Sequence, residues 1–241
     1  MKTYLRLVLS VLVWLPQWLM AAPVLRLQIV QRPPYLMISP NGDVSGISVG
    51  PTVAAFKKAG IPIKWEEVPA LRQLERLAHN QERVCSVGWY KTAERERFAK
   101  FTDPISQDSP WVGFANSSFT PPQNATVAAV LADPRMTVLL KNGYVYGAYL
   151  DQQIAAMKAQ REETTGDMPQ VFRMIAAGRA QLTFAPLEEI QYYLNAHLIS
   201  ATNTKIIAFK EIPAGYQRYL MCSKQVEDAV ITQFNAALQA R

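Results

Sequence analysis

The stretch GWYKTAER at residues 88–95, continued by FTDP at 101–104, decides the fold of this 241-residue chain. It follows Val84–Val87, an apolar run with the length of a buried strand. A strand that opens into a helix directs backbone N–H groups at the space above it, and the helix dipole favours an anion there. If Thr92 caps this helix, Arg95 lies one turn inside it and can hold a carboxylate by two parallel hydrogen bonds. The alternative is a surface ion pair between Arg95 and a neighbouring glutamate.

Outward from this stretch, the apolar pattern predicts an α/β chain with two units. The first unit has predicted strands at 24–30, 61–65 and 84–87, and helices at 52–59 and from residue 69. After an irregular stretch at 104–123, which holds a possible connecting strand at 111–114, the second unit has predicted helices at 127–131, 150–160, 171–177 and 187–198, and strands at 136–140 and 181–185. A strand at 218–222 and a helix at 226–238 end the chain.

Composition excludes several classes of function. The chain is 49% hydrophobic and 18% charged, which is ordinary for a globular protein and argues against disorder. Its net charge of +6 is scattered along the sequence, whereas nucleic-acid binding requires basic residues gathered on one face. There is no metal-ligand spacing, no glycine-rich phosphate loop and no Gly-x-Ser-x-Gly elbow. We therefore predict no cofactor, no metal and no nucleic-acid partner.

The N-terminus has the features of a cleaved signal peptide at residues 1–22. Lys2 and Arg6 give a positive start, Leu7–Met20 is mostly apolar, and Ala21 and Ala22 suit a signal peptidase. The apolar run is shorter than the roughly 20 residues of a membrane span. We expect export to the periplasm; the alternative is an uncleaved anchor.

Several motifs in one consistent order resemble a known family. Gly88, Thr92, Arg95, Phe101, Thr102 and Pro104 fall in register with the signature of type 2 periplasmic binding proteins, in the solute-binding family of the polar amino-acid receptors. The opening loop RPPY at 32–35, the loop GYVYG at 143–147 and GRAQ at 178–181 resemble further motifs of that family. The resemblance covers about residues 24–240 and identifies the chain as a divergent member.

The resemblance implies a monomer of two lobes, each a mixed, mostly parallel sheet flanked by helices, with two hinge crossings near 110–114 and 207–212. Lobe 1 would comprise residues 23–113, lobe 2 residues 114–209, and a return strand and helix at 210–241 would complete lobe 1. The lobes would close over a small ligand by hinge motion.

The resemblance also implies the ligand contacts. By analogy with the family, Arg95 clamps a carboxylate and Thr92 offers a hydroxyl to the cap or to the ligand. Further candidate ligand contacts on loops that would face the cleft are Gly88, Trp89, Tyr90, Tyr35, Tyr144, Tyr146 and Glu188. The family's ammonium-binding aspartate corresponds to Pro186, and its carboxylate-binding serine or threonine to Tyr90. These departures favour a carboxylate without an ammonium, or an aromatic or peptide-like ligand, over a standard α-amino acid.

Two cysteines, Cys85 and Cys222, would lie in an oxidising compartment, where a disulfide is the natural expectation and two buried thiols the alternative. The resemblance places both cysteines in lobe 1 on adjacent strands, which favours the disulfide.

We therefore expect a non-enzymatic, exported solute-binding protein that presents its ligand to a membrane partner, either an ABC transporter permease or a sensor. One alternative is an exported dehydratase of the same fold, for which Glu188, Glu189 and Glu94 are the candidate acids. The other is a sensory or assembly module that has lost its ligand.

Overall fold

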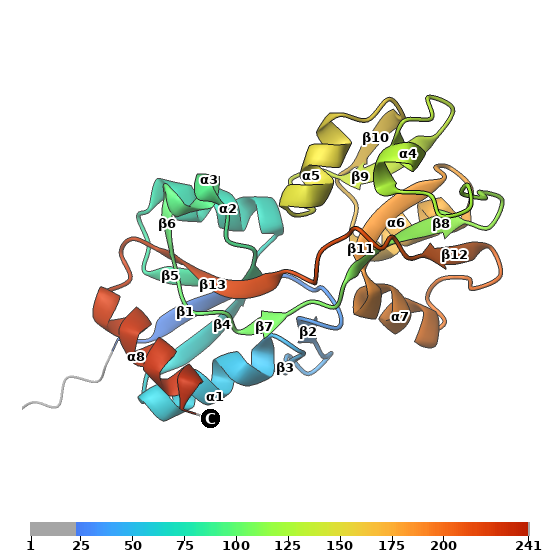
Figure 1. Ribbon diagram of the computed structural model, residues 1–241. Coiled ribbons are helices and arrows are strands. Elements are labelled where there is room, and N and C mark those ends of the chain that lie inside the picture. Colours follow the sequence, from blue (N-terminus) through green and yellow to red (C-terminus); the bar gives the residue numbers. More distant parts are fainter. Residues whose placement is uncertain (1–22, 241) are drawn as a thin grey trace, which may run out of the picture.

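The computed structural model describes residues 23–240, and the predicted signal peptide at 1–22 lies outside that range. The described chain forms two α/β lobes joined by two crossing segments (Figure 1). Lobe 1 comprises residues 23–107 and 217–240, and lobe 2 comprises residues 111–212. Among the described residues, no helix combines the length and the hydropathy that a membrane span requires.

The sheet of lobe 1 has the strand order β4-β1-β5-β13-β6, with β7 also paired to β13. It is mixed, because β1 runs parallel to β4 and β5 whereas β13 runs antiparallel to β5 and β6. Its strands are β1 (Leu25–Ile29), β4 (Ile63–Glu67), β5 (Val84–Trp89), β6 (Ala99–Phe101), β7 (Ser106–Gln107) and β13 (Gln217–Ser223), and a separate hairpin pairs β2 (Met37–Ile38) with β3 (Val44–Ser45).

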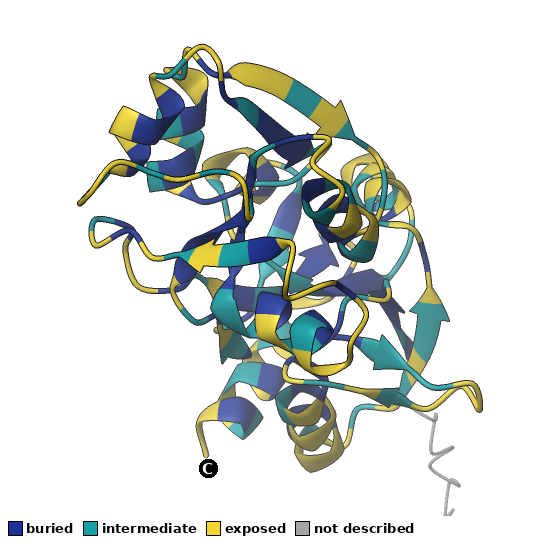
Figure 2. Ribbon diagram, turned by 90° about the vertical axis from the view of Figure 1, so that its right-hand side faces the viewer, coloured by how far each residue is buried: buried dark blue, intermediate teal, exposed yellow. Residues whose placement is uncertain are grey.

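Helices cover both faces of this sheet (Figures 1 and 2). They are α1 (Val49–Ala59) and α8 (Asp228–Gln239) on one face, α2 (Ala70–His79) on the other, and the short α3 (Ala93–Glu96) directly after β5. Successive side chains of a strand point to opposite faces, so they build two separate cores. Cys85 packs with Phe56 of α1 and Phe234 of α8, whereas its neighbour Val84 packs with Leu77 of α2.

Lobe 2 repeats this layered plan with the strand order β10-β9-β11-β8-β12. Its strands are β8 (Trp111–Asn116), β9 (Thr137–Lys141), β10 (Gln160–Thr164), β11 (Leu182–Pro186) and β12 (Thr204–Ile207), and its helices are α4 (Val127–Leu131), α5 (Ala148–Ala155), α6 (Met168–Ala176) and α7 (Leu187–Asn195). Val138 of β9 packs toward Leu150 of α5, and the next residue, Leu139, packs toward Phe172 of α6.

The lobe boundaries differ from those we expected from the sequence. Trp111 already pairs with Pro186 in the sheet of lobe 2, so lobe 2 begins at residue 111 and not after residue 113. Phe209 and Ile212 are buried in the lobe 2 core, so the chain leaves lobe 2 after residue 212 and not at 209. Packing of these apolar side chains fixes both boundaries.

The sequence analysis did not predict two strands of lobe 2. The helix expected at 150–160 ends at Ala155, and residues 160–164 form β10, a polar, largely exposed edge strand without the alternation that marks a half-buried strand. β12, at 204–207, also lacks a clear pattern and was not expected. Both strands form because β9 and β8 offer unpaired backbone groups beside them.

The two crossing segments lie side by side. The backbone N–H of Asp108 donates to the backbone carbonyl of Tyr216 at 2.9 Å. The side-chain amide of Gln107 donates to the backbone carbonyl of Gly215 at 3.0 Å. A Cβ atom at position 215 would lie 1.8 Å from the carbonyl oxygen of Asp108, so only glycine permits this approach. The crossings therefore form one paired connection between the lobes.

Cys85 and Cys222 are joined by a disulfide. They stand opposite each other in the antiparallel pair of β5 and β13, with Cα atoms 3.9 Å apart. The bond links residues 137 positions apart and thereby closes a loop that contains the whole of lobe 2. It attaches the returning strand β13 to the centre of the lobe 1 sheet.

We predict that the double variant Cys85→Ala/Cys222→Ala unfolds with a free energy about 3–5 kcal/mol below that of the wild type, because opening so long a loop raises the entropy of the unfolded chain. Denaturant titration followed by circular dichroism measures this difference. As a control, a reducing agent should lower the stability of the wild type to that of the variant and leave the variant unchanged. Equal unfolding midpoints for the two oxidised proteins would contradict the prediction.

Candidate functional site

The loops that follow the carboxyl ends of the parallel strands meet between the lobes, which is where open α/β sheets bind ligands. Lobe 1 contributes the segments after β1, β4 and β5, and lobe 2 contributes the loop at 141–145 after β9. Four neighbouring cavities of about 60, 210, 640 and 160 Å³ lie there, each lined by residues of both lobes. All four border Tyr144, so this residue lies centrally among them.

Arg95 lies in this region, in the geometry that its sequence context predicts. Thr92 is the N-cap of α3, and its hydroxyl accepts the backbone N–H of Arg95 at 3.2 Å. The side chain of Arg95 is buried, and it borders the cavities of 60 and 640 Å³. Its Nη1 donates to the carbonyl of Tyr90 at 2.8 Å, and its guanidinium carbon lies 4.7 Å from the ring centre of Trp89.

No carboxylate of the described chain forms an ion pair with Arg95. Burial lowers the pKa of its guanidinium, because the charged form loses contact with water. The surface pairing with Glu94 or Glu96 that we considered as an alternative is not formed; Glu96 pairs with Lys91 instead. Arg95 is therefore a cation that is held in place by a carbonyl and an indole ring and lacks a carboxylate partner within residues 23–240.

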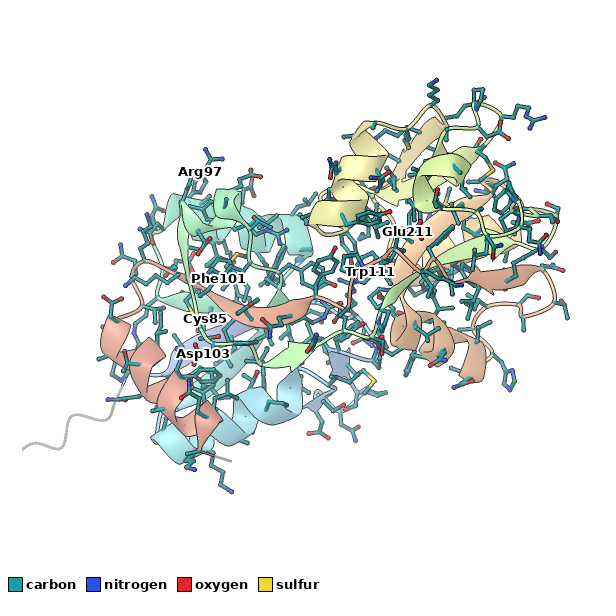
Figure 3. All side chains as sticks on the ribbon, viewed as in Figure 1. Cys85, Arg97, Phe101, Asp103, Trp111 and Glu211 are labelled. Atoms are coloured by element: carbon teal, nitrogen blue, oxygen red, sulfur yellow. A yellow bond between two sulfur atoms is a disulfide. The ribbon has the colours of Figure 1, made fainter. Side chains whose placement is uncertain are left out.

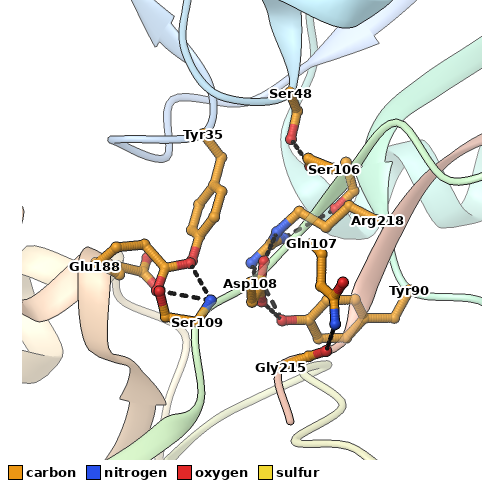
Figure 4. Close-up of polar contacts among 12 residues, drawn as sticks. Tyr35, Ser48, Tyr90, Ser106, Gln107, Asp108, Ser109, Glu188, Gly215 and Arg218 are labelled. Carbon is orange, nitrogen blue, oxygen red and sulfur yellow. Dashed lines mark hydrogen bonds and ion pairs between the residues drawn. The ribbon is translucent and has the colours of Figure 1, made fainter. Parts of the chain in front are cut away.

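A second guanidinium, that of Arg218, is buried and hydrogen-bonded to other groups of the protein (Figure 4). Its Nε and Nη2 donate to the carboxylate of Asp108 at 2.5 and 2.9 Å, and its Nη1 donates to the carbonyl of Gly88 at 3.0 Å. The hydroxyl of Tyr90 also donates to Asp108. Burial raises the pKa of the Tyr90 hydroxyl, which keeps it protonated and able to donate. Tyr90 thus supports this network between the crossing segments.

A third guanidinium, that of Arg32 in lobe 1, is paired with Glu189 of lobe 2. The pair is bidentate, with Nε and Nη2 at 2.9 and 2.8 Å from the two carboxylate oxygens, and Glu189 is fully buried. Beside it, the hydroxyl of Tyr35 donates to Glu188 at 2.5 Å, and the backbone N–H of Ser109 donates to the same carboxylate at 3.0 Å (Figure 4). These contacts connect the two lobes directly.

Tyr144 and Tyr146, which we expected together in the cleft, have different surroundings. The ring of Tyr144 lies between two cations, with its centre 4.7 Å from the guanidinium carbon of Arg32 and 5.0 Å from the ammonium nitrogen of Lys141. Tyr146 points into the core of lobe 2, where it packs on Trp111 at 5.6 Å between ring centres and its hydroxyl accepts the backbone N–H of Lys141. Trp111 itself lies where the lobes meet (Figure 3).

The structure therefore brings most of the expected residues to one region and gives many of them structural partners. Arg95, Trp89, Gly88, Tyr90 and Tyr144 line the 60 Å³ cavity. Tyr35 and Glu188 bind each other across the cleft, and Thr92 serves as the helix cap. Among the described residues, no group of three or more histidine, cysteine, aspartate or glutamate side chains is arranged to hold a metal ion.

The sequence analysis missed the roles of Arg32, Asp108 and Arg218. Arg32 stands in the opening loop that we had quoted, but nothing in that loop indicates a partner 157 residues away. Asp108 and Arg218 are 110 residues apart and carry no motif. They meet because the two crossing segments lie side by side, an arrangement that exists only in the folded chain.

The model of the bacterial extracellular solute-binding proteins, family 3, matches residues 25–240. No curated protein matches the chain. Its fold is similar to that of the periplasmic VFT2 domain of BvgS from Bordetella pertussis (18% identity, 93% of this chain and 90% of that chain, TM-score 0.74). The fold is also similar to that of an ancestral arginine-binding protein bound to arginine (14% identity, 91% of this chain and 92% of that chain, TM-score 0.71). A further similar structure is that of the ancestral amino acid-binding protein AncCDT-1, a precursor of cyclohexadienyl dehydratase (16% identity, 90% of this chain and 88% of that chain, TM-score 0.69). The chain, which matches the family model over nearly all of its described length, belongs to the bacterial extracellular solute-binding proteins of family 3.

Proposed function

We propose that this chain is an exported, non-enzymatic binding protein that closes on a small ligand bearing a carboxylate and presents it to a membrane transporter or sensor. The observation that supports this proposal is the buried guanidinium of Arg95, which borders the cavities between the lobes and has no carboxylate partner in the described chain. Family membership supports the solute-binding role in general.

A buried cation without a carboxylate in direct contact is unfavourable. The charges of Glu94 and Asp151 offset the effect of burial on Arg95 only in part, because the pKa of its guanidinium is still lowered, so a compensating group is expected. A carboxylate is the matching group, because the planar guanidinium can donate two parallel, charge-assisted hydrogen bonds to it. The carbonyl of Tyr90 and the ring of Trp89 hold the guanidinium in place before any ligand arrives, so less ordering is required on binding. Thr92 contributes by fixing the start of α3.

Export is part of the proposal. The positive start, apolar run and small residues of segment 1–22 have the order of a signal peptide, and the family model is one of extracellular proteins. The disulfide between Cys85 and Cys222 suits an oxidising compartment such as the periplasm.

Binding is favoured over dehydration chemistry by the partners of the candidate acids. A general acid must present its proton to the substrate. Glu188 accepts hydrogen bonds from Tyr35 and from the backbone of Ser109, and Glu189 is bound by Arg32. The carboxylates of these two residues are thus engaged by donors of the protein itself, whereas Glu94, the third candidate acid, is an exposed side chain beside Arg95.

One observation favours a second candidate, a sensory module that adopts its closed form without a ligand. The Arg32–Glu189 pair already joins the two lobes through charges of the chain itself. In a transport receptor, the ligand would supply much of the free energy of closure. A domain whose own ion pair holds it closed would instead be regulated by a signal that separates the two lobes.

We predict that Arg95→Met weakens ligand binding at least about 100-fold, since two charge-assisted hydrogen bonds of about 1.5–3 kcal/mol each are lost. The probe is the small molecule released from protein purified without denaturation and identified by mass spectrometry, and isothermal titration calorimetry measures its affinity. Arg97→Met, which removes an exposed arginine two residues away, is the matched control and should bind as the wild type does. Unchanged affinity in Arg95→Met would refute the role of Arg95.

The second candidate predicts that Glu189→Gln opens the ligand-free protein. Breaking a buried ion pair leaves an uncompensated charge at a cost of about 3–5 kcal/mol, and Arg32 can regain water by separation of the lobes. Small-angle X-ray scattering should then give a larger radius of gyration than for the wild type. Glu162→Gln, on β10 of the same lobe and without an ion-pair partner among the described residues, should leave it unchanged. If Glu189→Gln keeps the wild-type radius, the ion pair does not hold the lobes together.

A further inference from the structure

The chamber bounded by Arg32, Tyr90 and Arg218, here called the inner chamber, is too small for an organic acid. Its volume is about 60 Å³, well below the roughly 300–1,000 Å³ typical of small-molecule sites. Its walls are fixed by the Arg32–Glu189 and Arg218–Asp108 ion pairs. A ligand there would have to break buried ion pairs, which is strongly unfavourable.

A larger chamber, here called the outer chamber, lies on the other side of Arg95, between α2, α3 and the lobe 2 loop at 143–145. Its volume of about 640 Å³ is within the range of roughly 300–1,000 Å³ typical of small-molecule sites. Its lining residues are Leu71, Leu74, Glu75, Ala78, Glu94, Arg95, Phe98, Gly143, Tyr144 and Val145. Arg95 lines both chambers, together with Gly143, Tyr144 and Val145 of lobe 2.

The wall that α2 contributes to the outer chamber is apolar. Leu71, Leu74 and Ala78 recur at helical spacing, so they form a stripe beside the residue that faces the core, Leu77. Leu71 is 53% exposed, so much of its side chain is available to a ligand in the chamber. Phe98 adds a further apolar surface next to Arg95. This wall suits an apolar ligand body.

The charges around the outer chamber restrict the ligand further. Arg95 is the only basic residue in its lining, so it has room for one carboxylate. Glu75 and Glu94 line the chamber as exposed side chains, so their charges act only weakly on a ligand, and a second anionic group would find no cation to bind there. An α-ammonium next to the carboxylate would approach the guanidinium of Arg95. The nearby carboxylate of Asp151 accepts the backbone N–H of Tyr146, and that of Glu189 is bound by Arg32, so neither is placed in the chamber lining to hold the ammonium. Exposed glutamates at the rim contribute little to compensate this.

We propose that the ligand is a monocarboxylate with an apolar body and without an α-ammonium group, held in the outer chamber with its carboxylate on Arg95 and its body against Leu71, Leu74 and Phe98. The proposal rests on the proposed function, from which it takes the role of Arg95, and adds the place and the chemical class of the ligand.

The test compares three pairs of probes that differ only in the α-ammonium: 3-phenylpropionate with L-phenylalanine, 4-methylpentanoate with L-leucine, and indole-3-propionate with L-tryptophan. Affinities are measured by isothermal titration calorimetry on the mature protein. At least one desamino acid should bind more than tenfold more tightly than its amino-acid partner. Adipate, a dicarboxylate, should bind more weakly than that acid.

The location of the site is tested with two exposed leucines. Leu71→Asn should weaken binding of the preferred acid by about tenfold, because the ligand loses apolar contact area with the leucine side chain. Leu198→Asn replaces a leucine that is 52% exposed in lobe 2, outside the lining of the chamber, and should have no effect. Both substitutions are at exposed positions, so the variants should fold.

The outcomes separate the two proposals. If an amino acid binds more tightly than its desamino partner, depends on Arg95 and is insensitive to Leu71→Asn, the monocarboxylate proposal is overturned and the proposed function stands. If the desamino acid is preferred but Leu71→Asn binds it as the wild type does, the outer chamber is not the site. If none of the probes binds and the natively purified protein releases no carboxylate, both proposals fail.

Discussion

The ion pair between Arg32 and Glu189 sets how the two lobes meet. Glu189 has no contact with solvent, and a carboxylate without solvent is tolerated only when a cation and hydrogen bonds compensate it. Arg32 supplies both through two parallel bonds from the other lobe. The contact between the lobes and the burial of Glu189 therefore depend on each other. Tyr35 reinforces the arrangement through its hydrogen bond to Glu188.

This pairing leaves an unequal distribution of charge in the cleft. Arg32 and Arg218 each have a carboxylate within 3 Å, whereas Arg95 has only a carbonyl and an indole ring. The two paired guanidinium groups connect parts of the protein that are distant in sequence, whereas the third forms no ion pair within the described chain. A site with an unpaired cation beside an apolar wall selects ligands by charge first and by shape second.

The returning strand β13 connects the stability of the protein to its candidate site. Cys222 on this strand forms the disulfide with β5, and Arg218 at its beginning binds Asp108 on the other crossing segment. Gly215, just before the strand, allows the two crossing segments to touch. One short segment thus fixes the sheet of lobe 1, the connection between the lobes and the position of the buried network. Movements of the lobes must take place around this paired connection.

Most helices and strands could be predicted from the sequence because their determinants are local, whereas the two crossings and the returning strand of lobe 1 were expected from the resemblance. The alternation in β1, the cap at Thr92 and the position of Arg95 one turn into α3 each depend on residues a few positions apart. The edge strand β10 could not be predicted, because its pairing comes from β9 and not from its own polar sequence. The partners in the cleft could not be predicted either. Arg32 finds Glu189 across 157 residues, and only the folded chain brings such distant charges within hydrogen-bonding distance and removes the water that would otherwise weaken their attraction.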